Sequence, residues 1–393
     1  MRTTSTDSRT DLIENLILSL GSATNRRNLK KSVKLFESVP ENSENYYEVS
    51  LRLVSTLIYL DKDRAFSILD KLHNNKHAMS LYGALIEFEF ANYFHSRHRL
   101  SKALVHVQAA IEIAKSEHDY KHSCVCNSLR GRLLYIMGKH KEAEKVIVNA
   151  LDDAKKLDDL GWQAVNMTTL GHIYFRSGDY SRSKAMLEES IIAHQETGNL
   201  MMTIASQNFL AEVLIDESKL DEAEAIAKVA FNIAREANMP NAIGGSLLVL
   251  SRLHIEGEKF RDAESALDRA ESIYISLPSE LGLRNAAELK AMLGERTKNW
   301  ELCVSCYTNV ISKDAKSNLL KYSIENSNFD KLLNAIKQLS SSQTLNIVEC
   351  TLQQLRKIVL NYDGDDYHNE LNALTSNVEA CISVLGNEKF KAN

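Results

Sequence analysis

The sequence predicts an all-α solenoid, which is a stack of antiparallel helix hairpins, and three observations support this. Segments that begin at Leu129, Thr169, Phe209 and Val249 align without gaps at a spacing of 40 residues. Small residues fill fixed columns of this alignment, as they do in repeat proteins. The 393 residues include only 3 prolines and 15 glycines, too few for the many turns of an all-β fold.

Two columns hold small side chains in every repeat. The first small column contains Ala91, Gly131, Gly171, Ala211, Ser251 and Ala291. The second small column, 12 residues later, contains Ala103, Ala143, Ser183, Ala223, Ala263 and Cys303. Two antiparallel helices approach closely only where both carry small side chains. We therefore expect these columns to mark the crossing of the first and second helix of each hairpin.

The remaining columns indicate the turn and the contact with the next hairpin. Gly138 and Gly178 mark a tight turn between the two helices, because glycine tolerates left-handed dihedral angles. Ser218 and Glu258 stand in the same register. A bulky column should fill the gap towards the next hairpin, and it contains Leu100, His140, Tyr180, Leu220, Phe260 and Trp300.

The paired small columns resemble the tetratricopeptide repeat, in which a small residue of the first helix is followed by an alanine of the second. The matching pairs are Gly131/Ala143, Gly171/Ser183, Ala211/Ala223 and Ser251/Ala263. The unit of 40 residues is longer than the usual one of about 34. It is similar to the extended variant of kinesin light chains, of mitotic adaptors with GoLoco motifs, and of MalT-type and Rap-type bacterial regulators. The usual proline after the second helix is missing, since Lys155, Gln195 and Arg235 occupy that register.

The resemblance implies a right-handed solenoid that binds other polypeptides, and it is fullest over residues 80–312. We predict a core of repeats over 77–312, an N-terminal helical cap over 1–76 and a C-terminal helical cap over 313–393. Ser32 and Ala65 should occupy the small position of degenerate second helices. Terminal hairpins lack one neighbour, so atypical caps are expected. Amphipathic helices are expected in the C-terminal cap over 323–339, 347–362 and 368–385.

The composition argues against several classes of protein. The net charge of -5 provides no general attraction to nucleic acid or to an anionic membrane, so we do not expect direct nucleic-acid binding. No apolar run reaches the roughly 18 residues of a membrane span, and the start of the chain lacks the pattern of a signal peptide. Six cysteines in a chain of this length do not form a disulfide framework, which favours a cytoplasmic location.

No motif in the sequence identifies a catalytic or metal site. Cys303 and Cys306 have a redox-like spacing, but Cys303 stands in a small column and no second pair completes a zinc site. Cys124 and Cys126 are two residues apart on a helix, so they point to different faces and cannot chelate together. The run from Asp363 to Asp366 lacks the alternating ligands and the final glutamate of a calcium loop. We therefore expect no enzyme activity, no cofactor and no metal ion.

One compact basic cluster stands near the N-terminus. It contains Arg26, Arg27, Lys30, Lys31 and Lys34. We interpret it as the solvated face of a capping helix, and a contact with an acidic partner or with nucleic acid is the alternative.

The candidate binding surface is the concave side of the solenoid, which first helices line in tetratricopeptide repeats. Residues three before, one after and four after the first small column should face it. The candidate partner-binding residues are Asn92, Ser128, Arg132, Tyr135, Thr168, His172, Phe175, Asn208, Glu212 and Arg252. Such a wall suits a peptide, because polar groups satisfy its backbone and apolar groups hold its anchors. The alternative is that Tyr135 and Phe175 only pack against the next hairpin.

The leading functional hypothesis is a scaffold or adaptor that binds a partner peptide or protein segment. The alternative is a ligand- or peptide-responsive regulator that controls or sequesters a transcription or signalling protein, as the resemblance to bacterial peptide receptors implies. Residues 1–75 contain no convincing recognition helix for DNA, which favours a sequestering regulator over a DNA-binding one. A homo-oligomer stays open.

Overall fold

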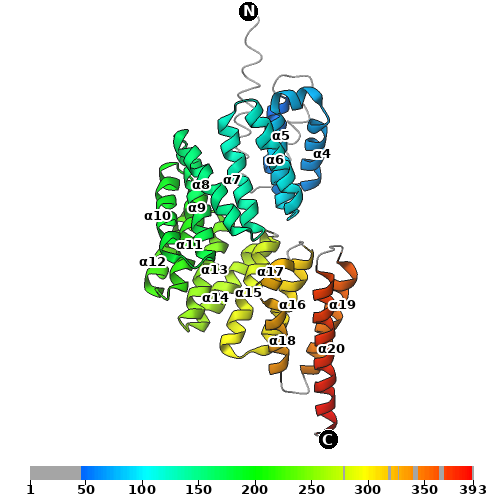
Figure 1. The fold of residues 1–393 in the computed structure, drawn as a ribbon. Coiled ribbons are helices and arrows are strands. Elements are labelled where there is room, and N and C mark those ends of the chain that lie inside the picture. The colour runs from blue at the N-terminus through cyan, green and yellow to red at the C-terminus, as the bar shows by residue number, and fades with distance from the viewer. Residues whose placement is uncertain are drawn as a thin grey trace, which may run out of the picture. The chain divides into compact units, whose positions relative to one another are not determined.

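The computed structural model describes residues 46–277, 279–316, 320–325, 327–339, 344–362 and 367–391, and all regular structure in these ranges is helical (Figure 1). In chain order the helices are α3 (Tyr46–Leu60), α4 (Lys62–His73), α5 (Lys76–Ser96), α6 (Leu100–Ser116), α7 (Tyr120–Ile136), α8 (His140–Lys156), α9 (Leu160–Arg176), α10 (Tyr180–Glu196), α11 (Leu200–Asp216), α12 (Leu220–Glu236), α13 (Pro240–Glu256), α14 (Phe260–Ser276), α15 (Glu280–Thr297), α16 (Trp300–Lys316), α17 (Leu320–Glu325), α18 (Asn328–Gln338), α19 (Thr344–Asn361) and α20 (His368–Lys391). The predicted fold class, an α-solenoid of stacked helix hairpins, is confirmed.

The hairpins pair an odd-numbered first helix with the even-numbered second helix that follows it, from α5 with α6 to α15 with α16. The small columns lie at the crossing of each pair, as the sequence predicts. A Cβ atom added to Gly131 would lie 2.4 Å from a side-chain carbon of Ile147, and one added to Gly171 would lie 2.7 Å from Leu187. The Ser183 hydroxyl of α10 donates a hydrogen bond of 2.8 Å to the carbonyl of Gly171 in α9. Helices this close tolerate no larger side chain at the crossing.

The turns between helices recur every 20 residues, which is half of the 40-residue period of the sequence repeat. Helices α6 and α7 are both 17 residues long, and so are α8 to α14. In the three-residue turns that connect α6 to α9, the middle residue has a positive φ, and these residues are His118 (58°), Gly138 (76°) and Asp158 (52°). The Lys139 N–H then bonds the Leu134 carbonyl at 2.9 Å, as in a Schellman cap. The turns between hairpins therefore have the same geometry as the predicted turns within them.

The contacts divide the chain into two units, residues 1–169 and 170–393, with the boundary inside α9. In the first unit, one cluster of buried apolar residues joins α3 to α5 and another joins α5 to α7. In the second unit, successive clusters run from α10 to α15 and end at the C-terminal helices. These units are defined by packing, whereas the cap, core and cap predicted from the sequence are defined by the regularity of the repeat. The predicted division into caps over 1–76 and 313–393 and a core over 77–312 stays a prediction.

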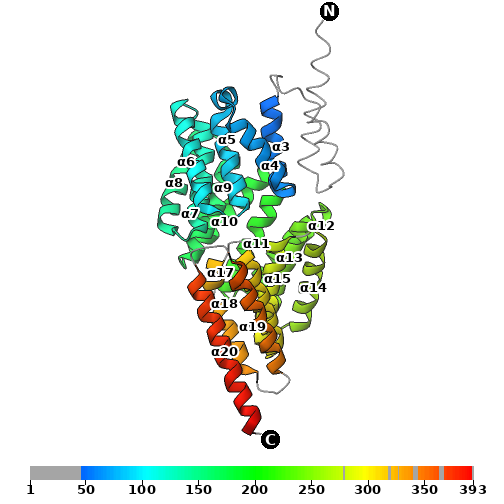
Figure 2. The same ribbon diagram turned by 90° about the vertical axis from the view of Figure 1, so that its right-hand side faces the viewer.

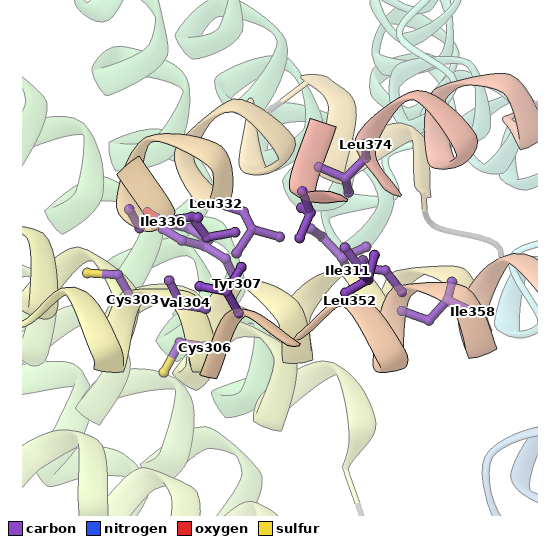
Figure 3. Packing of buried hydrophobic residues seen from close by; sticks show 14 of the residues in the cluster. Cys303, Val304, Cys306, Tyr307, Ile311, Leu332, Ile336, Leu352, Ile358 and Leu374 are labelled. Carbon is purple, nitrogen blue, oxygen red and sulfur yellow. The ribbon is translucent and has the colours of Figure 1, made fainter. Parts of the chain in front are cut away.

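The C-terminal helices cover the last hairpin. Tyr307 and Ile311 of α16 pack with Leu332 of α18, Leu352 of α19 and Leu374 of α20 (Figure 3). Helices α19 and α20 lie side by side in both ribbon views (Figures 1 and 2).

Some expectations for the caps can be compared with this arrangement. The helices expected over 347–362 and 368–385 correspond to α19 and α20. The helix expected from residue 323 to 339 is interrupted, because the left-handed φ of Ser327 (56°) separates α17 from α18. Ala65 is fully buried in α4, as expected for the small position. Ser32, the basic cluster and the run from Asp363 to Asp366 lie outside the described residues.

The cysteines of the CxxC sequence are packing residues of α16. Cys303 is fully buried and its thiol donates to the Ala291 carbonyl at 3.4 Å, which places it at the hairpin crossing (Figure 3). Cys306 is buried in the same cluster. Burial raises the pKa of Cys303 to about 12 and that of Cys306 to about 11, so both are thiols at neutral pH.

We expect Gly171→Leu and Ala223→Leu each to lower the free energy of unfolding by about 1–3 kcal/mol or more, because neither crossing has room for a larger side chain. Chemical denaturation measures the change. Ala185→Leu is the control, since Ala185 is exposed on the outer side of α10. Stabilities equal to the wild type in both crossing variants would show that the small columns are not at tight crossings.

We expect the double variant Cys303→Ala/Cys306→Ser to fold and to bind its partner nearly as well as the wild type, because both thiols only fill space in the core. Thermal melting and elemental analysis test this. Stoichiometric zinc in the purified wild type that is lost in the double variant would contradict it.

Candidate functional site

The first helices of successive hairpins lie against one another within each unit. Helix α5 contacts α7 in the first unit, and α13 contacts both α11 and α15 in the second. Side chains of these helices that point away from the second helices therefore form a shared surface, which we call the first-helix face. The candidate residues predicted from the sequence stand at its register positions.

In the first unit this face carries charged and polar groups of α5 and α7. The Asn92 amide donates to the Glu89 carboxylate at 3.5 Å. Burial raises the pKa of Glu89 to about 7, and the bond from Asn92 only partly opposes this. His95 lies near Arg132, and burial, the Arg132 charge and the His98 charge together lower the pKa of His95 to about 4. The sequence-based choice included Asn92 and Arg132 and missed Glu89.

Three other candidates of the first unit make contacts inside the protein. The ring of Tyr135 lies 5.5 Å from that of His140, centroid to centroid. Ser128 is 3% exposed and donates to the Cys124 carbonyl at 3.1 Å. Thr168 is 6% exposed and donates to the Ala164 carbonyl at 3.0 Å. The two hydroxyls thus bond their own helices at buried positions of the register.

In the second unit an aromatic contact joins α9 to α11. The ring centroid of Phe209 lies 3.8 Å from that of His172 and 5.2 Å from that of Phe175. Phe175 also contacts Tyr180 at 5.8 Å. Burial lowers the pKa of His172 to about 4, so this imidazole is neutral at pH 7. Phe175 therefore does pack against the next hairpin, while part of its side chain stays accessible on the first-helix face.

Ion pairs connect the next first helices. Arg252 of α13 lies 3.6 Å from the Glu212 carboxylate of α11 and is also paired with Asp216. Arg296 of α15 pairs with Glu256 of α13 at 2.5 Å. Burial raises the pKa of Glu212 and the neighbouring Asp216 charge adds to this, although Arg252 opposes it. The sequence-based prediction includes Glu212 and Arg252, which lie close together in the structure. It misses Asp216, Glu256 and Arg296, each of which stands five residues after the first small column.

Asn208 of α11 is the candidate with unused hydrogen-bonding capacity. Its side-chain oxygen is buried and has no hydrogen-bond partner among the described residues. Its amide nitrogen lies 3.8 Å from the position that a Cβ atom of Gly245 in α13 would occupy. Gly245, six before the first small column, was not chosen from the sequence. The break in its column, which holds Val125, Val165 and Ala205 in earlier repeats, could have revealed it.

The described residues show neither a cluster of metal ligands nor a candidate membrane span. No group of three histidine, cysteine, aspartate or glutamate side chains there is arranged to hold a metal ion. Within the same ranges, no helix combines the length and the apolar character that crossing a membrane requires.

Comparisons with known proteins agree with this geometry. The family model for the tetratricopeptide repeat matches residues 125–193. No curated protein matches the sequence.

Solved structures share the fold at low sequence identity. A Rap protein complexed with Competence and Sporulation Factor is 13% identical, covers 98% of this chain and 100% of its own, and has a TM-score of 0.61. The apo form of RapI is 14% identical, covers 68% of this chain and 97% of its own, and has a TM-score of 0.55. The apo form of the quorum sensor NprR from B. thuringiensis is 16% identical, covers 84% of this chain and 86% of its own, and has a TM-score of 0.51. The repeats of this chain are tetratricopeptide-like.

We expect the Glu89 carboxyl to make the stability of the first unit depend on pH. Its pKa in the folded state, about 7, exceeds the ordinary value of 4.5, so the folded state binds more protons and its stability falls as pH rises from about 4.5 to 7. Glu89→Gln removes this loss. Since the side chain is partly exposed, we expect the variant to gain on the order of 1–2 kcal/mol over the wild type at pH 8 and nothing at pH 4.

Urea unfolding at several pH values measures the difference. The exposed Glu188→Gln is the control, which should follow the wild type at every pH. Parallel pH profiles for Glu89→Gln and the wild type would contradict the raised pKa.

Proposed function

We propose that this protein is a non-enzymatic scaffold or adaptor whose first-helix face binds a peptide or a segment of a partner protein. The observation that carries the proposal is the Asn208 amide, whose buried oxygen has no hydrogen-bond partner within the part of the chain that the structure describes. A side-chain amide offers both a donor and an acceptor, which match the C=O and N–H groups of a peptide backbone. A buried acceptor without a partner costs about 1–3 kcal/mol, so an N–H group supplied by a ligand would remove that cost.

The neighbours of Asn208 suit a bound peptide. Gly245 presents no side chain beside the amide, which leaves room for a second backbone to approach. His172 and Phe175 on α9, together with Phe209, offer aromatic surface for an apolar anchor. Glu212 and Arg252 carry opposite charges, so they can also recognise charged side chains of the peptide.

The first unit offers a comparable surface with a different charge pattern. Arg132 is exposed, and Asn92, Glu89 and Tyr135 are partly exposed on α5 and α7. We propose that this surface binds polar side chains of the same partner or of a second one. The buried Ser128 and Thr168 then contribute by holding their helices rather than by direct contact.

A second candidate function is a ligand-responsive regulator that sequesters a signalling or transcription protein. Its support is the match in fold over nearly the whole chain to a Rap protein complexed with Competence and Sporulation Factor, together with the match to the quorum sensor NprR. In this version the peptide on the first-helix face is a signal, and a separate protein is the target. We place either activity in the cytoplasm.

We expect Asn208→Ala, Arg132→Ala and Phe175→Ala each to weaken partner binding by about tenfold or more, which corresponds to about 1.4 kcal/mol. A pull-down from the native host with mass spectrometry identifies the partner, and calorimetry then measures the affinity of each variant. Arg132→Ala should melt like the wild type, and Asn208→Ala should melt no lower than the wild type, because it removes the unpartnered acceptor. Phe175→Ala should also lose stability, because Phe175 packs against Phe209 and Tyr180.

The controls lie outside the first-helix face. Asn232→Ala matches Asn208→Ala in chemistry at an exposed position of second helix α12. Glu144→Lys and Glu188→Lys reverse charges on second helices. If these control variants abolish binding while the three face variants bind normally, the protein uses another surface and the assignment is wrong.

A further inference from the structure

The outer side of the first unit departs from the repeat pattern between α6 and α8. A hollow of about 880 Å³ opens there, with side chains of both second helices as its walls and α7 as its floor. Its apolar lining includes Leu104, Val105 and Val146. In later repeats the column of Leu104 holds charged residues, namely Glu144, Lys184, Glu224 and Glu264. Val105 is 68% exposed, so this part of α6 presents to solvent an apolar surface that the repeat does not require.

Arg130 stands in the floor of the hollow at a position that is apolar in four of the five other repeats. It directly precedes the first small column, where the other repeats carry Phe90, Leu170, Leu210, Leu250 and Lys290. Its Nη1 donates to the Gln108 side-chain oxygen at 3.2 Å, whereas its Nε is buried and finds no hydrogen-bond acceptor in the described ranges. Burial lowers the pKa of Arg130, and among the described residues no carboxylate forms an ion pair with it.

Lys290 shows how a positive charge at the same repeat position is paired elsewhere in the chain. Its ammonium group lies 3.0 Å from Asp268 and 2.6 Å from Glu271, both on the preceding second helix α14. The residues at the corresponding positions before Arg130 are Gln108 and Ile111. Both carboxylates are thus replaced by uncharged side chains beside Arg130, at the place where the hollow lies.

The other charged groups at the hollow do not replace those carboxylates. Glu112 accepts a hydrogen bond of 3.0 Å from the Gln108 amide and is exposed at the rim. Glu142 and Lys145 line the opposite wall on α8 and are both exposed. The hollow therefore combines apolar walls with a half-buried guanidinium group that lacks a carboxylate.

The length of the hollow indicates the shape of its occupant. Its lining on α6 runs from Ser101 to Glu112, about three helical turns or roughly 17 Å at 1.5 Å per residue. A groove between two helices with apolar walls is the kind of surface that takes the apolar face of a third helix. We propose that this hollow is a second docking surface, which binds an amphipathic helix of a partner protein and pairs one of its carboxylates with Arg130. It is independent of the first-helix face.

A selection from a phage-displayed library of helical peptides tests this proposal on the full chain. We expect peptides that carry Asp or Glu next to leucine-like residues, and that bind Arg130→Leu and Val105→Asp about tenfold or more weakly than the wild type. Arg130→Leu introduces the residue that later repeats carry in this column, so it should fold, and thermal melting checks both variants. Val229→Asp is the matched control, because Val229 is an exposed valine on second helix α12, and it should bind like the wild type.

The Arg130 Nε resonance in arginine-labelled protein gives a direct readout. It should shift when a selected peptide is added, and it should not shift with a version whose acidic residues are replaced by Gln or Asn. The proposal is overturned if no selected peptide depends on both Arg130 and Val105, or if the neutral version binds equally well. A wild-type dimer in sedimentation that Val105→Asp converts to a monomer would assign the surface to a second copy of the chain, and would also overturn it.

Discussion

The close crossing of the two helices in each hairpin is the constraint on which the other features depend. At Gly131 and Gly171 the second helix leaves no space even for a methyl group, and Ser183 bonds directly to the backbone of the facing helix. The side of the first helix that carries the small column is therefore fully occupied. Only its other sides remain to contact neighbouring hairpins or a ligand, which is why the candidate site consists of residues at fixed distances from that column.

The contacts along the stack are of several chemical kinds. Aromatic rings join α9 to α11, and ion pairs join α11 to α13 and α13 to α15. Such partly exposed contacts each contribute modestly, of the order of 1 kcal/mol or less. Because they are local, changes in one hairpin should affect mainly its neighbours. This tolerance allows single positions such as Arg130 or Asn208 to depart from the repeat without loss of the fold.

The fold and the repeat position of each candidate residue could be predicted from the sequence. The burial and the interaction partners of each candidate side chain could not. The small columns predict that Asn208 and Arg252 face a ligand, and the structure places them on the first helices α11 and α13. Their role in binding stays a prediction. The burial of Ser128 depends on how each helix is rotated against its neighbours, which a single register does not specify. The pairing of Arg252 with Asp216 depends on the distance between hairpins in the same way. Glu89 and Arg130, however, are charged residues in columns that are mostly apolar, and that signal was already present in the sequence.

The most direct test of the central claim is to map the protected amides in the complex between the full chain and the partner retrieved from the native host. If the crossing leaves the first-helix face as the main binding surface, hydrogen–deuterium exchange should slow in the first helices α11 and α13 on binding. The intervening second helices α12 and α14 should then exchange as in the free protein. Slower exchange confined to second helices, with the first helices unchanged, would contradict the account.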